Sequence, residues 1–348
     1  MSSAFSTLLS EKGYLIADGA MGTNLFQRGL ETGDCPELWN VDHPDRVKDV
    51  HREFLEAGSD LFLTNSFGGT RHRLKLHNAQ ERAQELNAAA AKIAREAADG
   101  YMKETGRKVL VAGSIGPTGE LFQPLGALTH EDGVAAFREQ AQGLAAGGVD
   151  LFWIETMSSS DELSAAVAGV CGLGIPYVCT LTFDTNARTM MGITPEEFAA
   201  LAQSFEPQPL AFGANCGVGP SELVHSILGI SSVAKSANLV AKGNCGIPQY
   251  VEGEIVYSGT PEAMADYAKI ARDAGATIIG GCCGSTPIHV KAIADSLNGY
   301  TPGERPTEAR LTEVLGQPWA QAGRLSTHSV SDEGEDGGGR RRGRRRRS

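Results

Sequence analysis

A single pattern of apolar and polar positions repeats along the 348-residue chain. A short apolar run, of the kind that forms a buried strand, is followed by a turn marked by Gly, Asn, Asp or Ser. A longer amphipathic stretch, typical of a helix, comes next. The pattern predicts eight strands, at residues 14–20, 61–67, 109–115, 151–157, 177–183, 210–216, 238–244 and 277–283.

The amphipathic stretches between these strands predict eight helices. Four of them open at proline, which the first helical turn tolerates because the missing N–H needs no partner there. Several end at a glycine just before the next strand, as a left-handed helix stop does. The predicted helices lie at residues 45–57, 80–104, 131–147, 160–171, 195–204, 220–234, 261–274 and 287–297.

Eight βα units within about 300 residues match the size and the alternation of an α/β fold of the TIM type, a (β/α)₈ barrel. We therefore expect one barrel domain over residues 10–300. A doubly wound open sheet is the alternative, but eight units in series with no second type of composition favour closure. The first strand is not followed by a dinucleotide or phosphate-binding glycine motif, because residues 18–23 lack the required spacing.

Charge and cysteine content narrow the class of protein. A net charge of −11 argues against a general nucleic-acid binder. The chain has no apolar run near the ~18 residues of a membrane span, and its first residues lack the basic start and apolar core of a secretory signal. Seven scattered cysteines in such a chain predict reduced thiols in the cytoplasm rather than a disulfide framework.

The character of the chain changes after residue 300. Residues 301–348 are predicted to form a C-terminal extension, in which an acidic patch at 332–336 precedes three glycines and then seven arginines among residues 340–347. Like-charge runs of this kind predict disorder from about residue 325. The extension could bind RNA, an acidic partner or the acidic body of the chain, or be merely solvated.

Residues that could take part in catalysis or binding lie at the predicted strand ends, where barrels of this type carry their functional groups. The two adjacent cysteines of the last strand would share one mouth with the cysteine that ends the sixth strand. Buried cysteines are commonly inert, and adjacent ones can form a strained disulfide. Three thiols at one mouth nevertheless match a zinc site with an open fourth position. The strand-end residues are Asp18, Asn65, Glu155, Asn215, Cys216, Cys282 and Cys283.

A zinc ion held by three thiolates has a net charge of about −1, which suits a fourth thiol better than a water molecule. Metal binding deprotonates that thiol near neutral pH. The expected reaction is therefore attack by a substrate thiol on an electrophilic carbon, with methyl or alkyl transfer to sulfur. Cys245 also follows a strand and is a candidate spare ligand, whereas Cys35, Cys171 and Cys179 are expected to be structural.

Two carboxylates are predicted at the same mouth, Asp18 and Glu155, and two roles are open for them. They could be helix caps or salt-bridge partners. They could instead recognise a cationic group, such as the ammonium of an amino-acid substrate. The carboxylate of that substrate could then be held by backbone amides around Gly19, Ala20 and Met21.

The chain resembles the homocysteine S-methyltransferase family, and within it the homocysteine-binding domain of cobalamin-dependent methionine synthase. The likeness runs from about residue 10 to residue 300 and places a block at most strand ends. The matching blocks are DGAMGT (18–23), GSDLFLTNSFGGTR (58–71), IGPTGE (115–120), IETM (154–157), GANCGVGP (213–220), GNCGIP (243–248) and GGCCGSTP (280–287).

The resemblance implies a zinc-dependent (β/α)₈ barrel that methylates L-homocysteine to methionine. It places the zinc ligands of the family on Cys216, Cys282 and Cys283. The contacts to the homocysteine ammonium fall on Asp18 and Glu155. Asn65 and Asn215 lie close by.

The methyl donor is open among methylcobalamin, betaine and S-methylmethionine, all of which members of the family accept. The betaine enzymes surround a quaternary ammonium with aromatic rings, and the positions where such rings would follow Phe67 and Glu155 are Gly68 and Thr156 here. The resemblance therefore favours methylcobalamin. The chain ends where the folate and cobalamin modules of a methionine synthase would begin, so the corrinoid is expected to arrive on a separate protein.

Two other hypotheses stay open at this point. The same site could use betaine or S-methylmethionine directly. The barrel could also be a non-catalytic zinc- or thiol-binding partner whose C-terminal extension does the work. Apart from that arginine-rich extension, neither nucleic acid nor a membrane is an expected partner.

Overall fold

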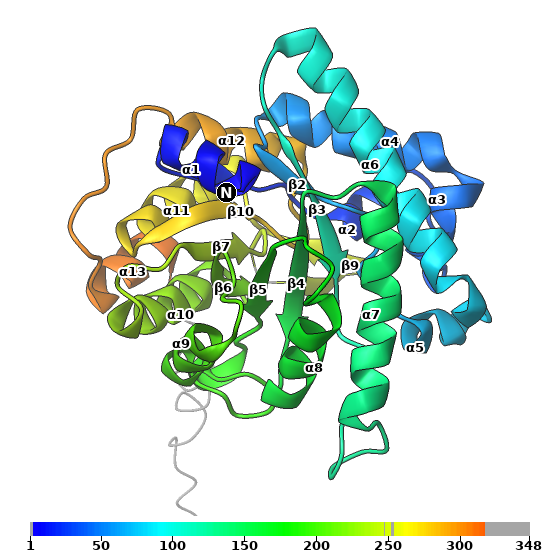
Figure 1. The fold of residues 1–348 in the computed structure, drawn as a ribbon. Helices are drawn as coiled ribbons and strands as arrows, with labels where there is room; N and C mark the ends of the chain where they lie inside the picture. The colour runs from blue at the N-terminus through cyan, green and yellow to red at the C-terminus, as the bar shows by residue number, and fades with distance from the viewer. Residues whose placement is uncertain (1–2, 247, 252–253, 317–348) are drawn as a thin grey trace, which may run out of the picture.

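Eight parallel strands form the centre of the computed structural model, which describes residues 3–316 except 247, 252 and 253. Helices surround the strands on the outside (Figure 1). The predicted disordered, arginine-rich segment lies outside the described residues. The strands are β1 (Leu15–Ile16), β2 (Leu61–Leu63), β3 (Leu110–Ile115), β4 (Leu151–Met157), β5 (Tyr177–Leu181), β6 (Phe212–Cys216), β7 (Leu239–Gly243) and β10 (Ala276–Gly281).

The sheet runs in the order β1-β10-β7-β6-β5-β4-β3-β2 and closes between its first and last members. One parallel bridge, Ala17 to Leu61, joins β1 to β2. Two aspartates strengthen this seam from opposite ends. Asp60 accepts the N–H of Ile16 at 2.9 Å, and Asp18 accepts the N–H of Leu63 at 2.8 Å. The predicted (β/α)₈ barrel is confirmed.

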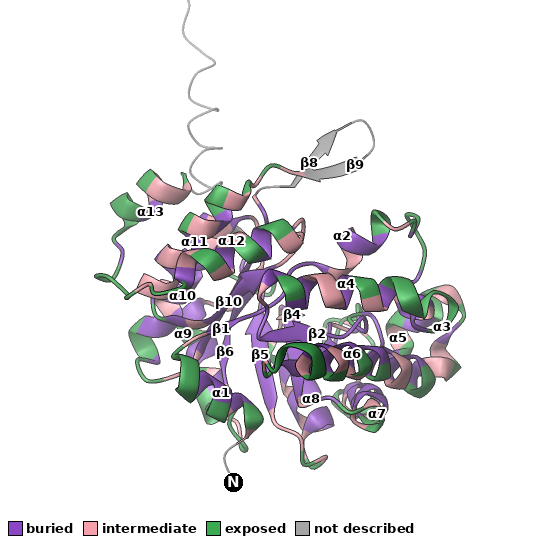
Figure 2. Ribbon diagram, turned by 90° about the horizontal axis from the view of Figure 1, so that it is seen from above, coloured by how far each residue is buried: buried purple, intermediate pink, exposed green. Residues whose placement is uncertain are grey.

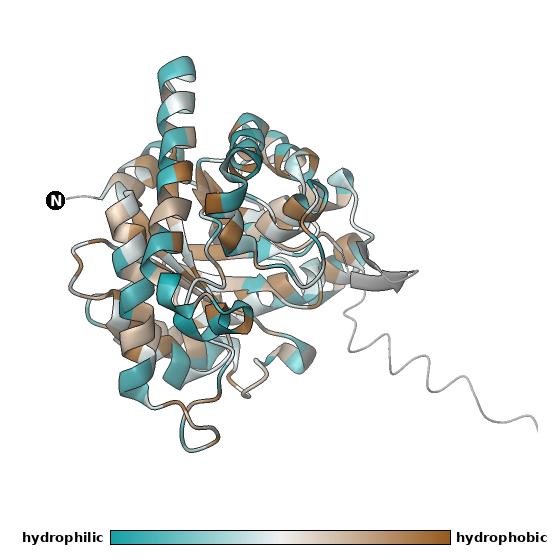
Figure 3. Cartoon of the chain, turned by 90° about the vertical axis from the view of Figure 1, so that its right-hand side faces the viewer, coloured by the Kyte–Doolittle hydropathy of each residue, from teal (hydrophilic) through white to brown (hydrophobic). Residues whose placement is uncertain are grey.

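The outer helices begin and end within three residues of the predicted positions. Their apolar sides face the sheet and their polar sides face outward, as the burial and hydropathy colouring show (Figures 2 and 3). They are α4 (Pro44–Ala57), α6 (Ala83–Thr105), α7 (His130–Gly147), α8 (Ser160–Val170), α9 (Pro195–Ser204), α10 (Pro220–Val233), α11 (Pro261–Asp273) and α12 (Pro287–Leu297).

Two large apolar cores and one small cluster result in the described part of the chain. One lies between the sheet and the outer helices, and the other fills the barrel interior with side chains such as Leu61, Trp153 and Val240. An N-terminal helix that the pattern did not predict, α1 (Ala4–Lys12), adds Phe5 and Leu8 to the interior core. The barrel is therefore filled by packed side chains below the level at which its strands end.

Other elements were also missed, because they are short or polar. They are the helices α2 (Met21–Phe26), α3 (Trp39–Asp42), α5 (Arg71–Leu74) and α13 (Glu308–Leu315), four 3₁₀ turns, and the antiparallel pair β8 (Pro248–Val251) and β9 (Glu254–Tyr257). The terminal helix α13 contacts α10 and α11 and buries Leu311. Among the described residues, no helix combines the length and the hydropathy that crossing a bilayer would require.

The first two strands are shorter than predicted. After Ile16 the backbone passes through the bridge at Ala17 and then bonds to the last βα loop, where the N–H of Ala20 donates to the carbonyl of Ser285 at 3.1 Å. After Leu63 the chain also turns, because the N–H of Ser66 donates to the carbonyl of Thr64 at 2.9 Å. Both departures move polar residues from the sheet into the loops at its carboxyl end.

A buried histidine on α4 makes the stability of this fold sensitive to acid. His51 is 0% exposed, neither ring nitrogen has a hydrogen-bond partner, and its ring lies 5.0 Å from that of Phe62. Burial lowers the pKa of His51 to about 3. The unfolded state takes up a proton below about pH 6.5 that the folded state refuses, so this residue costs stability as the pH falls from 6.5 towards 3.

We expect His51→Leu to remove that sensitivity. In the wild-type protein the histidine lowers the free energy of unfolding by about 2 kcal/mol between pH 7 and pH 5, and leucine has no proton to bind. Urea unfolding at the two pH values measures the difference. An equal decrease in the wild-type and His51→Leu proteins would contradict the assignment.

Candidate active site

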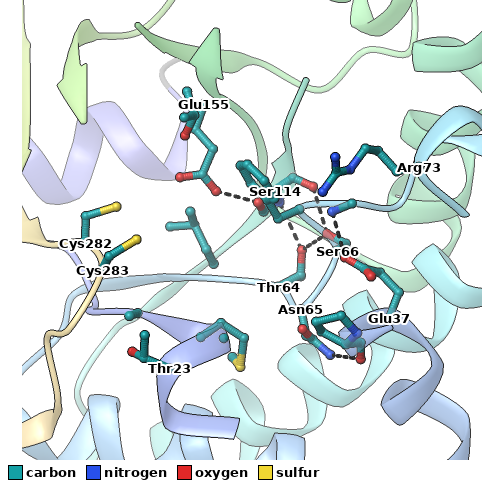
Figure 4. A pocket seen from close by; sticks show the side chains of 18 of the residues that line it. Thr23, Glu37, Thr64, Asn65, Ser66, Arg73, Ser114, Glu155, Cys282 and Cys283 are labelled. Carbon is teal, nitrogen blue, oxygen red and sulfur yellow. Dashed lines mark hydrogen bonds between the residues drawn. The ribbon is translucent and has the colours of Figure 1, made fainter. Parts of the chain in front are cut away.

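Three thiols meet at the mouth of the barrel. Cys216 is the last residue of β6, and Cys282 and Cys283 directly follow β10. The three Sγ atoms all lie within 4.8 Å of one another, and those of Cys216 and Cys283 are 3.8 Å apart. The predicted convergence of these residues is present in the fold. Figure 4 shows Cys282 and Cys283 side by side across the cavity from Ser114.

The adjacent cysteines can face one point because they stand in a turn rather than on a strand. The strand β10 ends at Gly281, so the alternation of side chains along a strand no longer applies. The turn closes through Gly284, whose φ of +78° suits glycine. A Cβ at Gly284 would also lie 2.3 Å from the Tyr257 ring. Any larger residue there would displace the turn that holds both thiols.

Asn215 holds the third thiol in place. Its Oδ1 accepts the N–H of Thr156 at 2.9 Å, and its Nδ2 donates to Thr156 Oγ1 at 2.7 Å. Cys216 and Thr156 have φ angles of +61° and +62°, which turn the chain sharply at the ends of β6 and β4. The Asn215 side chain also lies 3.9 Å from the Cys282 sulfur. Asn215 therefore ties two strand ends to the cysteine cluster, although it does not line the cavity itself.

The thiols share their protons unequally. Hydrogen bonds from Cys216 and Cys282 lower the pKa of Cys283 to about 3. Hydrogen bonds to Cys282 and Cys283 raise the pKa of Cys216. The hydrogen bond with Cys216 lowers the pKa of Cys282. The hydrogen bond with Cys283 and burial act more strongly in the opposite direction, and the pKa of Cys282 is raised to about 12. The hydrogen bonds within the cluster therefore favour the thiolate form of Cys283.

The sulfur positions fit a zinc ion. A tetrahedral zinc with bonds of ~2.3 Å to sulfur separates two of its sulfurs by about 3.8 Å, which matches the distance between Cys216 and Cys283. A disulfide needs about 2.05 Å, and all three cysteines are free. In the described part of the chain, no other group of His, Cys, Asp or Glu side chains comes close enough to hold a metal. Cys245 is outside the cluster, and its thiol donates to the Gly259 carbonyl at 3.3 Å.

Beside the thiols lies a cavity of about 420 Å³ that opens at the carboxyl ends of the strands. Asp18, Gly19, Ala20, Asn65 and Glu155, all predicted from the sequence, line it together with the three cysteines. The side chain of Asn65 is held in place, because its Nδ2 donates to the Pro36 carbonyl at 2.7 Å. The fold thus brings every predicted site residue except Asn215 to one cavity.

The backbone of the first βα loop comes very close to the last one. A Cβ at Gly19 would lie 2.7 Å from the Ser285 carbonyl and 2.8 Å from the Phe54 ring, so only glycine fits there. The N–H of Ala20 is already bonded to the Ser285 carbonyl. This amide is therefore not free for the substrate carboxylate that was predicted to bind at residues 19–21.

Sequence reasoning missed Lys242, a lysine at the end of β7. Its ammonium lies 2.5 Å from Asp18 Oδ1, and both side chains are 2% exposed. Burial opposes its charge, but attraction to Asp18, Glu155 and Cys282 outweighs burial and raises the pKa of Lys242. Burial raises the pKa of Asp18, against the attraction of Lys242. The signal in the sequence was one charged residue within the apolar run 238–244.

Glu155 is the second buried carboxylate of the cavity. Its Oε1 accepts the hydroxyl of Ser114 at 2.5 Å, as Figure 4 shows. Burial raises the pKa of Glu155 to about 7, while the nearby Lys242 acts to lower it. A cation placed beside Glu155 would therefore be strongly attracted to the ionised form.

Comparisons with known proteins identify the family of the chain. A family model described as homocysteine S-methyltransferase matches residues 15–297. The chain belongs to the homocysteine S-methyltransferase family. The resemblance noted from the sequence motifs is confirmed, and so is the expectation of a methyltransferase.

Solved structures of the homocysteine methyltransferase MmuM from Escherichia coli are similar to this family member. The metallated form is 26% identical, with a TM-score of 0.70 over 83% of this chain and 98% of the other. The oxidized form is also 26% identical, with a TM-score of 0.71 over 84% and 99%. A methyltransferase from Methanosarcina mazei, 13% identical with a TM-score of 0.51 over 84% and 97%, shares the fold alone.

Proposed function

We propose that this protein is a zinc-dependent homocysteine S-methyltransferase that makes methionine. The observation that carries the proposal is the meeting of three thiols with two buried carboxylates at one cavity, in a chain of this family. The thiols suit a metal that holds sulfur, and the carboxylates suit the ammonium of an amino acid. Homocysteine offers both groups in one small molecule.

The proposed zinc ligands are Cys216, Cys282 and Cys283. These three thiolates would hold zinc, which would supply the positive charge that keeps a substrate thiol deprotonated at neutral pH. The spacing of the sulfurs supports this assignment. A similar protein, the E. coli homocysteine methyltransferase MmuM, has been solved in a metallated form. Cys245 has its own backbone acceptor and is not part of the proposed ligand set.

The proposed substrate-binding residues orient homocysteine against that centre. Asp18 and Glu155 form the acidic wall on the side of the ammonium. Gly19, Ala20 and Asn65 shape the wall on the side of the first two strands, and Asn215 acts from behind by fixing the strand ends. Holding the amino acid at its charged groups leaves its sulfur at the thiols and its open side toward the mouth.

We propose methylcobalamin on a separate protein as the methyl donor, which makes the chain the homocysteine-binding half of a split methionine synthase. The cavity of about 420 Å³ accommodates an amino acid but not a corrin, so the methyl group has to be presented at the mouth. The described lining has two phenylalanines, Phe26 and Phe67, and lacks tyrosine and tryptophan. This composition does not favour a quaternary-ammonium cage.

The rim of the mouth supports a protein-bound donor. Large apolar side chains stand exposed on segments that follow β1, β2, β3 and β5, with exposed fractions from 48% to 77%. They are Phe26, Leu76, Leu121, Leu125 and Met190. Phe26 and Leu76 line the cavity itself, and exposed apolar groups of this kind are typical of a surface that another protein covers.

Direct use of betaine or S-methylmethionine is the second candidate. One observation favours it: Arg73 lines the cavity, is exposed, and makes no ion pair within the described residues. A free guanidinium at the rim could hold the carboxylate that both small donors carry. The two candidates share the thiol centre and differ only in how the methyl group arrives.

A donor assay with the zinc-loaded protein separates them. L-Homocysteine is incubated with a methylcobalamin-loaded corrinoid protein, with betaine, or with S-methylmethionine, and methionine is measured by mass spectrometry. We expect methionine only with the corrinoid protein, because only a protein-borne donor would cover the apolar rim. Turnover with either small donor alone would reject the split arrangement, and no turnover with any donor would reject the proposed reaction.

A further inference from the structure

The cavity contains a buried cation that the proposed reaction has not yet used. Lys242 stands in β7 at the level of Asn215 and Gly280, one position before the level at which β6 ends in Cys216. Its side chain points into the barrel, where Nζ lies 5.8 Å from the centre of the Trp153 ring, and it lines the cavity. The packed interior lies on one side of the ammonium and the substrate cavity lies on the other.

The hydrogen bonds at Lys242 are incomplete, whereas those at Asp18 are satisfied. An ammonium has three donors, and within the described residues Lys242 uses one of them, in a hydrogen bond to Asp18 Oδ1. Both oxygens of Asp18 are engaged, Oδ1 by Lys242 and Oδ2 by the N–H of Leu63. A buried charge is costly unless its remaining donors find acceptors. Donors that lack a protein partner and border a cavity are suited to an acceptor on the ligand.

The charges of the cavity lead to the same assignment. Asp18 and Glu155 alone would give two negative charges against the single ammonium of an amino acid. Lys242 pairs with Asp18, so of these two carboxylates Glu155 is the one that has no ion-pair partner among the described residues. In the part of the chain that the structure describes, Glu155 has a hydrogen-bond partner, Ser114, at one oxygen only. One free carboxylate and one incompletely bonded ammonium match the two charged ends of a zwitterion.

Resting on the proposed function, we propose that Lys242 recognises the carboxylate of the thiol amino acid, while Glu155 receives its ammonium and Asp18 serves as the counter-ion of Lys242. The pocket is therefore selective for zwitterionic thiols. The N–H of Ala20, a donor expected to hold this carboxylate, is already bonded to Ser285. Arg73, the other cation of the lining, is exposed at the rim.

The test compares L-homocysteine with 3-mercaptopropylamine, which keeps the thiol and the ammonium but lacks the carboxylate. Calorimetry on the zinc-loaded full-length protein gives the two dissociation constants. We expect the wild-type protein to bind homocysteine roughly 100-fold more tightly, the scale of a buried charged contact. Asp18→Asn/Lys242→Met removes both members of the ion pair without leaving either charge unpaired. In that variant the preference should fall to about 3-fold or less.

A matched control removes a lysine from another buried aspartate at the opposite end of the barrel. Lys12 pairs with Asp60 at 2.6 Å, and Asp60 keeps Arg107 when the lysine is lost. Lys12→Met should retain the wild-type preference for homocysteine. Zinc content and melting temperature are measured for each variant, so that a folding defect is recognised.

Two results would overturn the assignment. One is a wild-type protein that binds the two thiols equally, a result that needs no variant to fold. The other is a folded, zinc-loaded double variant that keeps the full preference, which would place the carboxylate on the first turn of α2. Calorimetry needs no methyl donor, so failure of the proposed reaction in the donor assay is a separate result.

Discussion

Replacing Cys282 with serine is expected to abolish zinc binding and to lower kcat/KM for homocysteine by at least about 1,000-fold. A metal that stabilises charge at sulfur contributes several kcal/mol to the rate, and the proposed site has only three protein ligands to hold it. Serine offers a hydroxyl that stays protonated at neutral pH. Metal content by atomic emission and methionine formation under a common donor measure the two effects.

Cys245→Ser is the matched control for that experiment. Cys245 is a buried cysteine next to the same mouth, but its thiol donates to a backbone carbonyl, as a serine hydroxyl also can. It should keep the wild-type zinc content and rate. A Cys282→Ser protein that still binds one zinc per chain and methylates homocysteine at the wild-type rate would disprove the proposed centre.

Glu155→Gln is expected to raise KM for homocysteine by about 100-fold and to change kcat much less. A buried carboxylate facing an ammonium contributes roughly 3 kcal/mol, and this contact is present before and during methyl transfer. Loss of such uniform binding appears in KM. Initial rates over a range of homocysteine concentrations, at a saturating donor, separate the two constants.

Glu162→Gln is the matched control, because Glu162 is buried to a similar extent as Glu155. Glu162 is 5% exposed against 7% for Glu155, but its carboxylate accepts the N–H and the hydroxyl of Thr118 and does not border the cavity. A glutamine oxygen can accept both bonds, so KM should stay at the wild-type value. Equal effects of the two substitutions would mean that Glu155 acts through the fold and not through the substrate.

The helical layer could be predicted closely because its signals are local. Proline at the first helical position sets the start of α9 and of α12 at the predicted residues. The lengths of β1 and β2 were overestimated, because an apolar run does not show at which residue the backbone stops pairing with the neighbouring strand. The packing of α1 into the barrel interior could not be predicted either. The end of the barrel that α1 covers is formed only when the sheet closes.

The thiol cluster could be predicted because strand order and strand ends place Cys216 beside Cys282 and Cys283 in any barrel of this topology. The pairing of Lys242 with Asp18 could not, because 224 positions separate these residues and only their side-chain directions bring them together. The commitment of the Ala20 amide to Ser285 was hidden for the same reason. Long-range polar contacts depend on geometry that periodicity does not encode.

The closing seam of the barrel gives ligand binding a thermodynamic consequence. Asp18 carries a hydrogen bond across the narrow join between β1 and β2, and the same residue is the counter-ion of the cavity lysine. A ligand that orders Lys242 also fixes the Asp18 carboxylate on which the join depends. Ligand binding and closure of the barrel are therefore thermodynamically coupled. Ligand binding should therefore stabilise the barrel at this join.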